Sequence, residues 1–254
     1  RDAWVDNPFH FYATPFHKVY AINLEKEILT HADKIIVTTR HIKENILRRY
    51  KFLNQEDVVI ISHGYDPEDF LFDEKIYPNP NKFTITHSGV FQDDRTPEYF
   101  LKAFANFLEL KKGAKENSFL KLIGVMRNEH TKLIKKLNLE NNVNITGYLN
   151  HKDAVRNLLD SDVLWLMLND TVRSPGKLYE YFGAKKTMLI TAPDGLMKRQ
   201  ALESKAAFTT LPNDIEAITK ALLELYDLWK QRNLPIPSDS FSNQFNRKEL
   251  TNLL

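Results

Sequence analysis

The feature that most constrains the fold of this chain is a regular alternation of short apolar segments and amphipathic segments between residues 83 and 230. The apolar segments have the length and β-branched content of buried strands, and the segments between them repeat apolar residues at helical spacing. Strands that alternate with helices form βαβ units, which assemble into a parallel sheet with helices on both faces. The sequence therefore predicts an α/β fold with a doubly wound, Rossmann-like parallel sheet.

Six strands and six helices are expected in this region. The strands are residues 83–88, 119–124, 143–147, 163–168, 187–191 and 206–210, and the helices are residues 97–111, 129–137, 151–160, 196–204, 214–230 and one that begins at Pro175. Ligands of such sheets bind outside the carboxyl ends of the strands. The candidate positions are therefore Ser88-Gly89, Gly124-Val125, Gly147-Tyr148, Leu168-Asn169 and Thr191-Ala192. Three of these ends carry glycine, which lets a ligand approach the backbone closely but also serves ordinary turns.

The part of the chain before residue 83 follows a shorter α/β pattern. After an aromatic, proline-broken segment, a helix is expected at 17–32, a strand at 34–39, a helix to about residue 50 and a strand at 58–62. Thr39 is predicted to cap the second helix. Residues 71–82 have two prolines and no hydrophobic period, so they are interpreted as a linker between domains.

Composition excludes several classes of protein. The 254-residue chain has no cysteine, which excludes disulfides and thiolate chemistry and fits a reducing cytoplasm. Its net charge of +2 comes with scattered lysines, so binding of nucleic acid is not indicated. No apolar run approaches the ~20 residues of a membrane span. The eight histidines do not cluster at the spacing of metal ligands, so no metal site is predicted.

The segment from Ser174 to Thr191 carries the strongest signal for a binding site. Pro175 suits the first turn of a helix, and apolar residues recur on one face at Leu178, Tyr181 and Phe182. The start of this helix carries Lys177 and Glu180. A helix N-terminus with a lysine suits a phosphate, and a carboxylate one turn later can accept hydrogen bonds from sugar hydroxyls. The alternative is an ordinary amphipathic helix with solvated ends.

A second candidate is the loop from Ser88 to Pro97, which joins a strand end to a helix. Arg95 lies just before that helix and can clamp a diphosphate with its planar fork of donors. The alternative is a surface arginine paired with Asp93 or Asp94.

The segment Lys177-Leu-Tyr-Glu180-Tyr181, followed by small residues and a strand, resembles the signature of GT-B glycosyltransferases of family 4 (group 1). Glu180 matches the later glutamate of the family's E-x7-E pattern, which binds the donor ribose. The earlier glutamate, which contacts the transferred sugar, falls on Val172, which cannot make that polar contact. The Lys-x-x-Glu-Tyr variant is similar to that of bacterial surface-polysaccharide enzymes, and it implies that Lys177 meets the donor phosphates or the sugar.

Three further segments carry the resemblance. Gly89 matches the glycine of the family's phosphate loop and Arg95 stands at its lysine, whereas Val90 replaces its arginine. The segment from Ile145 to Leu149 resembles the strand end that holds the nucleobase, which implies contacts from Tyr148 and Leu149. The alternative for Tyr148 is packing under its own loop. The turn that starts at His63-Gly64 resembles the family's interdomain hinge, and we assign no chemistry to it.

The resemblance extends over the whole chain and implies its domain organisation. Arg1-Asp2-Ala3-Trp4 is similar to an Arg-Asp-Pro-Trp segment late in the N-terminal domain of such enzymes. Residues 1–75 are thus expected to be the C-terminal part of the acceptor domain with a linker, the remnant of a second α/β domain. Residues 76–238 are expected to be the nucleotide-sugar donor domain. A C-terminal helix in residues 239–254 is expected to pack back toward the N-terminal domain.

The function implied is retaining transfer of a sugar from a nucleotide-diphospho-sugar donor to a carbohydrate or lipid-linked acceptor, in bacterial-type surface polysaccharide or glycolipid synthesis. Arg95 and Lys177 are the expected catalytic residues, because they would stabilise the leaving diphosphate without a metal. The expected donor-binding residues are Ser88, Gly89, Arg95, Gly124, Tyr148, Leu149, Lys177 and Glu180.

No cofactor and no metal are expected, and this chain alone is not expected to turn over. The expected location is the cytoplasm, with peripheral contact at the inner face of the membrane. Two alternatives keep the fold. Val90 and Val172 favour a non-catalytic nucleotide-binding module. A sugar-nucleotide epimerase would need acid/base carboxylates and histidines facing the cleft, and the sequence does not place such a set.

Overall fold

The computed structural model describes residues 3–7, 10–92 and 95–253, and the chain forms two compact units. Unit 1 consists of Arg1–His63 with Leu250–Leu254, and unit 2 of Gly64–Glu249. The boundary between the units falls in the predicted turn after residue 62. The segment interpreted as a linker, residues 71–82, contains no helix or strand.

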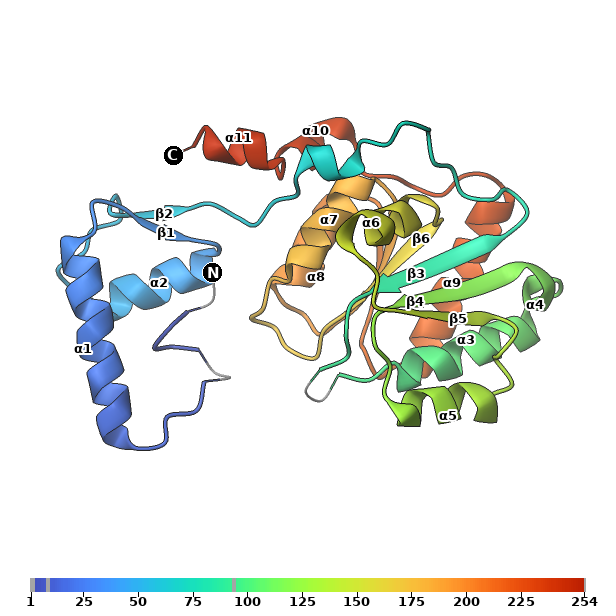
Figure 1. The fold of residues 1–254 in the computed structure, drawn as a ribbon, viewed down its shortest axis with the longest axis horizontal. Coiled ribbons are helices and arrows are strands. Elements are labelled where there is room, and N and C mark those ends of the chain that lie inside the picture. The colour runs from blue at the N-terminus through green and yellow to red at the C-terminus, as the bar shows by residue number, and fades with distance from the viewer. Residues whose placement is uncertain (1–2, 8–9, 93–94, 254) are drawn as a thin grey trace. The chain divides into compact units, whose positions relative to one another are not determined.

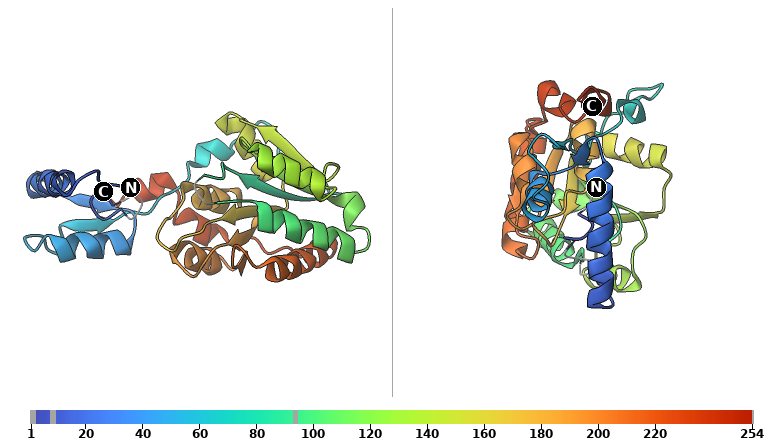
Figure 2. Two further views of the ribbon diagram at one scale, coloured as in Figure 1. Left: turned by 90° about the horizontal axis from the view of Figure 1, so that it is seen from below. Right: turned by 90° about the vertical axis from the view of Figure 1, so that its left-hand side faces the viewer.

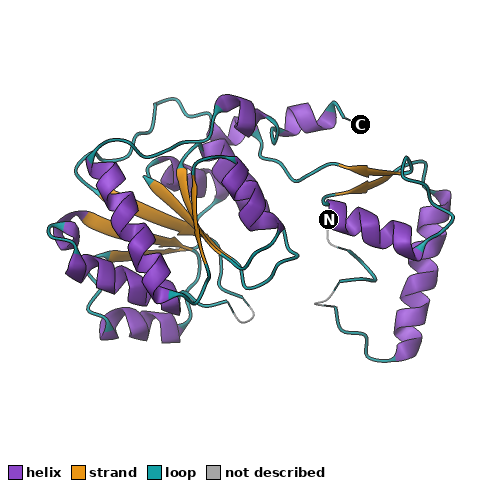
Figure 3. Cartoon of the chain, turned by 180° about the vertical axis from the view of Figure 1, so that it is seen from behind, coloured by secondary structure: helices purple, strands orange, loops and turns teal. Residues whose placement is uncertain are grey.

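Unit 2 is built on a six-stranded sheet whose strands are all parallel. The strands are β3 (Phe83–Ser88), β4 (Ser118–Ile123), β5 (Val143–Gly147), β6 (Val163–Met167), β7 (Thr187–Thr191) and β8 (Ala207–Thr210). Each lies within one residue of its predicted bounds. The order β5-β4-β3-β6-β7-β8 is doubly wound, as predicted (Figures 1 and 3).

Helices lie on both faces of this sheet (Figure 2). The helices are α3 (Glu98–Leu110), α4 (Ala114–Asn117), α5 (Asn128–Lys136), α6 (His151–Leu159), α7 (Gly176–Ala184), α8 (Leu196–Glu203), α9 (Ile215–Lys230), α10 (Asp239–Asn243) and α11 (Arg247–Thr251), with a 3-10 turn, η1 (Pro67–Phe70). Buried residues of α3, α5 and α9 share one apolar cluster, and those of α6, α7, α8 and α10 share the other.

The strands alternate their side chains between these two clusters, as a sheet buried on both faces requires. Strand β6 shows this clearly. Val163, Trp165 and Met167 belong to the α3 and α9 cluster. The residues between them, such as Leu164 and Leu166, belong to the α7 cluster. The continuous apolar run of this strand therefore supplies both halves of the core.

Three short elements of unit 2 were not predicted from the sequence: η1, α4 and α10. One helix was expected in residues 239–254; α11 lies there, and α10 is a separate short helix before α11. Ser238 caps α10, because its hydroxyl accepts from the amide of Phe241 at 3.2 Å. Glycine is required in α7, where a Cβ on Gly183 would lie 2.7 Å from ring atoms of Tyr65 and Phe70.

Unit 1 contains a parallel pair of strands, β1 (Ile35–Val37) and β2 (Val58–Ile60), with helices α1 (Pro15–His31) and α2 (Arg40–Arg49). The predicted cap is confirmed, because the hydroxyl of Thr39 accepts from the amide of Ile42 at 3.2 Å. Within the described parts of the chain, no helix combines the length and apolar character that a membrane span needs.

Candidate functional site

The candidate site lies where the winding of the sheet reverses. The chain passes from β3 outward to β5, and then returns to β6 on the other side of β3. In a doubly wound sheet, the crevice at such a switch point is where ligands bind. The carboxyl ends of β3 and β6 flank this point, and α7 follows β6 in the chain. Of the segments that were singled out, residues 88–97 start at the end of β3, and residues 174–191 follow β6 after the loop of residues 168–173.

Tyr181 holds helix α7 against both strands of the switch point. Its hydroxyl accepts from the amide of Ser88 at 3.1 Å and donates to the carbonyl of Trp165 at 3.0 Å. Burial raises the pKa of this phenol, so it stays a neutral hydroxyl that can make both bonds. One side chain thus connects α7 to the end of β3 and to the middle of β6.

The first turn of α7 carries the predicted pair. Pro175 is the N-cap, so α7 begins at Gly176, one residue later than predicted, and no side chain caps the helix. Lys177 donates to Glu180 Oε2 at 2.7 Å, and both side chains are partly exposed. The two residues are therefore brought together as an ion pair one turn apart, and a ligand has to compete with that pair for either of them.

The loop before α7 is built on Asp170. Its carboxylate accepts from the amides of Val172 at 3.0 Å and Arg173 at 2.7 Å, and from Arg173 Nε at 2.7 Å. Burial opposes ionisation of Asp170, but the hydrogen bonds from Arg173 and Val172 outweigh it and lower the pKa of the carboxyl. Arg173 is a cation at this strand end that sequence reasoning missed. Its signal was the Asp-x-x-Arg spacing directly after a strand.

The strand-end glycines have left-handed or otherwise positive φ: 156° at Gly89, 133° at Gly124 and 71° at Gly147. A Cβ on Gly124 would lie 2.3 Å from the carbonyl oxygen of Gly89. The amide of Gly124 also donates to the carbonyl of Gly147 at 2.9 Å. Close backbone packing between neighbouring strand ends therefore requires glycine at 124.

Tyr148 does not pack under its own loop, and that alternative is wrong. Its side chain is 85% exposed. A Cβ on the preceding Gly147 would meet no atom within 4 Å beyond its chain neighbours. Leu149 is half-buried. An exposed tyrosine has a π-face on which a planar ring can stack.

Arg95 lies in the loop between β3 and α3. Its Nε donates to the carbonyl of Gln92 at 3.2 Å, so part of the guanidinium is bound within its own loop. The alternative partners Asp93 and Asp94 lie outside the described residues, as do Arg1 and Asp2 of the N-terminal segment.

His87 is a polar residue of this strand end that sequence reasoning missed. It is 5% exposed, and its ring stacks on Phe91 with centroids 4.5 Å apart. Burial, together with the charges of Arg95 and Lys177, lowers its pKa to about 4, although the hydrogen bond to the Trp165 carbonyl opposes the shift. His87 is therefore a neutral imidazole that lies within electrostatic reach of both predicted catalytic cations. A histidine near the end of a predicted buried strand was the available signal.

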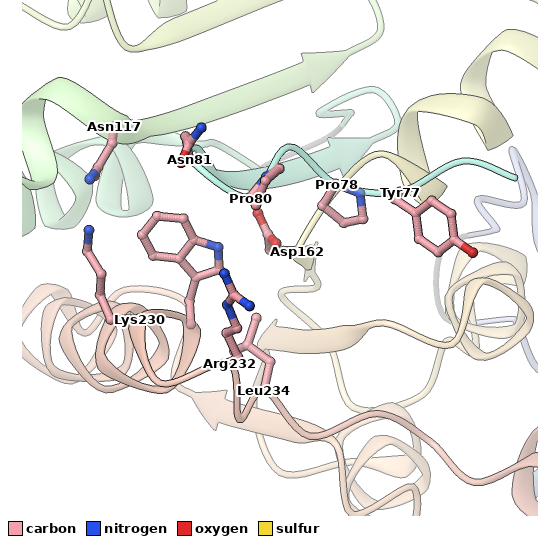
Figure 4. A pocket seen from close by; sticks show the side chains of 10 residues that line it. Tyr77, Pro78, Pro80, Asn81, Asn117, Asp162, Lys230, Arg232 and Leu234 are labelled. Atoms are coloured by element: carbon pink, nitrogen blue, oxygen red, sulfur yellow. The ribbon is translucent and has the colours of Figure 1, made fainter.

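A cavity of about 580 Å³ lies elsewhere in unit 2 (Figure 4). Its lining includes Asn81, Asn117 and Asp162, which lie one or two residues before the start of β3, β4 and β6. It therefore opens at the amino ends of the strands, opposite the candidate site. No group of three or more histidine, aspartate or glutamate side chains in the described part of the chain is arranged to hold a metal ion.

The family model of the glycosyl transferases group 1 matches residues 69–237. The chain belongs to this family. The solved structures that share the fold include the following three. Sucrose-phosphate synthase from Thermosynechococcus elongatus has a TM-score of 0.67 and 15% identity, and the match covers 95% of this chain and 62% of that chain. HepE from Anabaena in complex with UDP has a TM-score of 0.71 and 15% identity, and the match covers 99% of this chain and 69% of that chain. WaaG, a glycosyltransferase involved in lipopolysaccharide biosynthesis, has a TM-score of 0.65 and 17% identity, and the match covers 95% of this chain and 65% of that chain.

These similarities confirm the predicted family and the GT-B type fold of this group 1 glycosyl transferase. At such identities, the solved structures bear on the fold alone. The chain spans 62% of the length of the sucrose-phosphate synthase chain. No curated protein matches the chain in sequence.

Proposed function

We propose that this chain contains the donor-binding part of a glycosyltransferase that uses a nucleotide-diphospho-sugar. The observation that carries the proposal is the Lys177–Glu180 pair on the first turn of α7, which Tyr181 ties to the switch point of the sheet. A lysine beside free helix amides suits phosphate, and a carboxylate suits ribose hydroxyls. The family match at residues 69–237 and the UDP named for HepE support the same donor class.

The remaining donor contacts come from the other strand ends. Arg95 would hold the diphosphate together with Lys177, while the backbone of Ser88, Gly89 and Gly124 would allow close approach of the phosphates. Tyr148 and Leu149 would face the nucleobase, and the exposed ring of Tyr148 supports that role.

The proposed reaction is transfer with retention. The bond between C1 of the sugar and the β-phosphate oxygen breaks, and a bond from C1 to the acceptor oxygen forms on the same face. The hydroxyl proton of the acceptor passes to a phosphate oxygen of the leaving diphosphate. Negative charge grows on that diphosphate, so Lys177, Arg95 and the N-termini of α3 and α7 would stabilise it without a metal.

We also propose that residues 1–75 belong to an acceptor domain, with residues 239–254 packing toward it. Unit 1 leaves large apolar side chains of α1 exposed, such as Phe16 at 86% and Tyr20 at 65%, which suits a surface covered by further protein. The acceptor would be a carbohydrate or a lipid-linked sugar. The lipopolysaccharide biosynthesis named for WaaG supports surface polysaccharide synthesis. The proposed location is the cytoplasm or the inner face of the membrane.

Calorimetric titration with UDP, GDP, ADP and dTDP, with and without EDTA, tests the donor proposal. We expect one nucleotide to bind, with an affinity that EDTA leaves unchanged. Glu180→Ala should weaken its binding by roughly tenfold, because a charge-assisted hydrogen bond is lost. Glu203→Ala, at an exposed glutamate of α8, is the matched control. Unaltered affinity in Glu180→Ala would remove the role assigned to that residue.

The second candidate is a non-catalytic nucleotide-binding module. Val90 and Val172 favour it, because both stand where the family has polar ligands and both side chains are partly exposed. Product analysis with a nucleotide sugar and an acceptor distinguishes the two functions. Binding with no transfer by the full-length protein would favour the module.

A further inference from the structure

We propose that His87 is part of the donor site and that its Nε2 accepts a hydrogen bond from a hydroxyl group of the bound nucleotide sugar. The inference rests on the proposed function, since it names a further contact for the same ligand. It starts from a buried polar atom that nothing else in the described structure explains.

The tautomer of His87 follows from its partner. Nδ1 lies 3.1 Å from the carbonyl oxygen of Trp165. A carbonyl can only accept, so Nδ1 must carry the proton and donate. The same carbonyl also accepts from the hydroxyl of Tyr181, so both of its lone pairs are in use. In a neutral imidazole with the proton on Nδ1, Nε2 is a bare acceptor.

Nε2 has no hydrogen-bond partner among the described residues, although it is fully buried. Leaving a buried acceptor unpaired destabilises a folded protein, so such an atom calls for an explanation. Next to it is Gly89, since a Cβ there would lie 3.5 Å from Nε2. The bare nitrogen thus faces the strand end where the donor is proposed to bind.

The surroundings hold the ring rigidly and keep it neutral. Phe91 stacks on one side, and the Trp165 ring lies 4.9 Å away between centroids. Burial and the charges of Arg95 and Lys177 disfavour the imidazolium. A neutral acceptor repels phosphate oxygens and attracts hydroxyl protons. The chemistry therefore selects a hydroxyl of the ribose or of the transferred sugar next to the diphosphate.

Two substitutions separate the acceptor from the rest of the ring. His87→Asn keeps a donor at the position of Nδ1 for the Trp165 carbonyl but has no atom at the position of Nε2. His87→Gln can place its amide oxygen near the position of Nε2. Both are titrated with UDP and with UDP-glucose, or with the matching pair for whichever nucleotide binds the unaltered chain.

We expect His87→Asn to weaken binding by roughly tenfold, the loss of one buried hydrogen bond, and His87→Gln to recover most of it. If a ribose hydroxyl is the partner, UDP and UDP-glucose lose affinity alike. If a sugar hydroxyl is the partner, UDP-glucose alone loses affinity. Equal affinity of both variants and the unaltered chain for both ligands would overturn the inference while leaving the proposed function intact.

Nitrogen NMR of histidine-labelled chain provides a readout on the unaltered chain. The eight histidines are few enough for the His87 signal to be assigned from the His87→Asn spectrum. In the free chain, the Nε2 resonance of His87 should have the chemical shift of a nitrogen without a hydrogen bond. Bound ligand should move that chemical shift toward the value of a nitrogen that accepts a hydrogen bond. An unmoved resonance at saturation, or the signature of an imidazolium that donates to phosphate, would contradict the inference. If none of the four nucleotides binds, the proposed function fails, and this inference fails with it.

Discussion

The substitution Asp162→Asn tests whether a buried carboxylate at the amino end of β6 weakens the fold at neutral pH. Asp162 lies on the wall of the 580 Å³ cavity and accepts from the amide of Thr84 at 2.8 Å (Figure 4). Burial raises its pKa from 3.8 to about 6, and the Thr84 amide and the charge of Lys186 offset only part of that effect.

The direction of the effect follows from proton binding. Below pH 3.8, Asp162 is protonated in both the folded and the unfolded chain. Between pH 3.8 and about 6, the folded chain binds more protons, so the free energy of unfolding falls as pH rises through this window. At about 1.4 kcal/mol per pKa unit, ionised Asp162 costs the fold about 3 kcal/mol above pH 6.

Asparagine keeps an oxygen for the Thr84 amide and never ionises. We therefore expect Asp162→Asn to match the unaltered chain near pH 4 and to exceed it by about 1–3 kcal/mol in unfolding free energy at pH 7.5. Urea unfolding followed by tryptophan fluorescence measures this, since Trp165 and Trp229 both lie in unit 2.

Asp160→Asn is the matched control, because that carboxylate is more exposed and pairs with Lys121. A stability difference for Asp162→Asn that stays constant from pH 4 to pH 7.5 would refute the reasoning. So would the same pH profile in Asp160→Asn, because the effect would then come from net charge rather than from burial.

Two further substitutions test the packing of α7. Tyr181→Phe removes the hydroxyl between the Ser88 amide and β6, and urea unfolding should show a loss of about 1–3 kcal/mol; an unchanged midpoint would mean that water replaces the hydroxyl. Gly183→Ala gains about 1 kcal/mol of helix propensity but places a Cβ 2.7 Å from the rings of Tyr65 and Phe70. We expect a net loss of stability from overpacking, and a raised melting temperature would contradict it.

The sheet was predictable because its signal is local. Each strand of unit 2 is a short apolar run between turn residues, and the βα alternation restricts the topology to a parallel sheet. Short elements such as α4 and α10 escaped, because four or five residues are too few to show a period. Their position depends on tertiary contacts, such as the hydroxyl of Ser242 bonding to the carbonyl of Phe182.

The candidate site was predictable in part. Lys177 and Glu180 were placed on one helical turn, because their spacing alone decides that. Their mutual ion pair, and the buried state of His87, depend on side chains that meet only after folding. The link between His87 and the Trp165 carbonyl spans 78 positions of sequence, and nothing in the local pattern predicts it. The assigned donor contacts stay predictions until a nucleotide is bound.

The ion pair between Lys177 and Glu180 has a consequence for ligand selection. In the free chain, each charge already has a partner. A small anion that engages Lys177 alone would break the pair and leave Glu180 without its cation, so part of the binding energy would be spent on that loss. A ligand that offers phosphate and hydroxyls together would give both residues a new partner. On the proposed roles, the pair therefore discriminates against inorganic phosphate and sulfate, which are abundant and carry only half of the required groups.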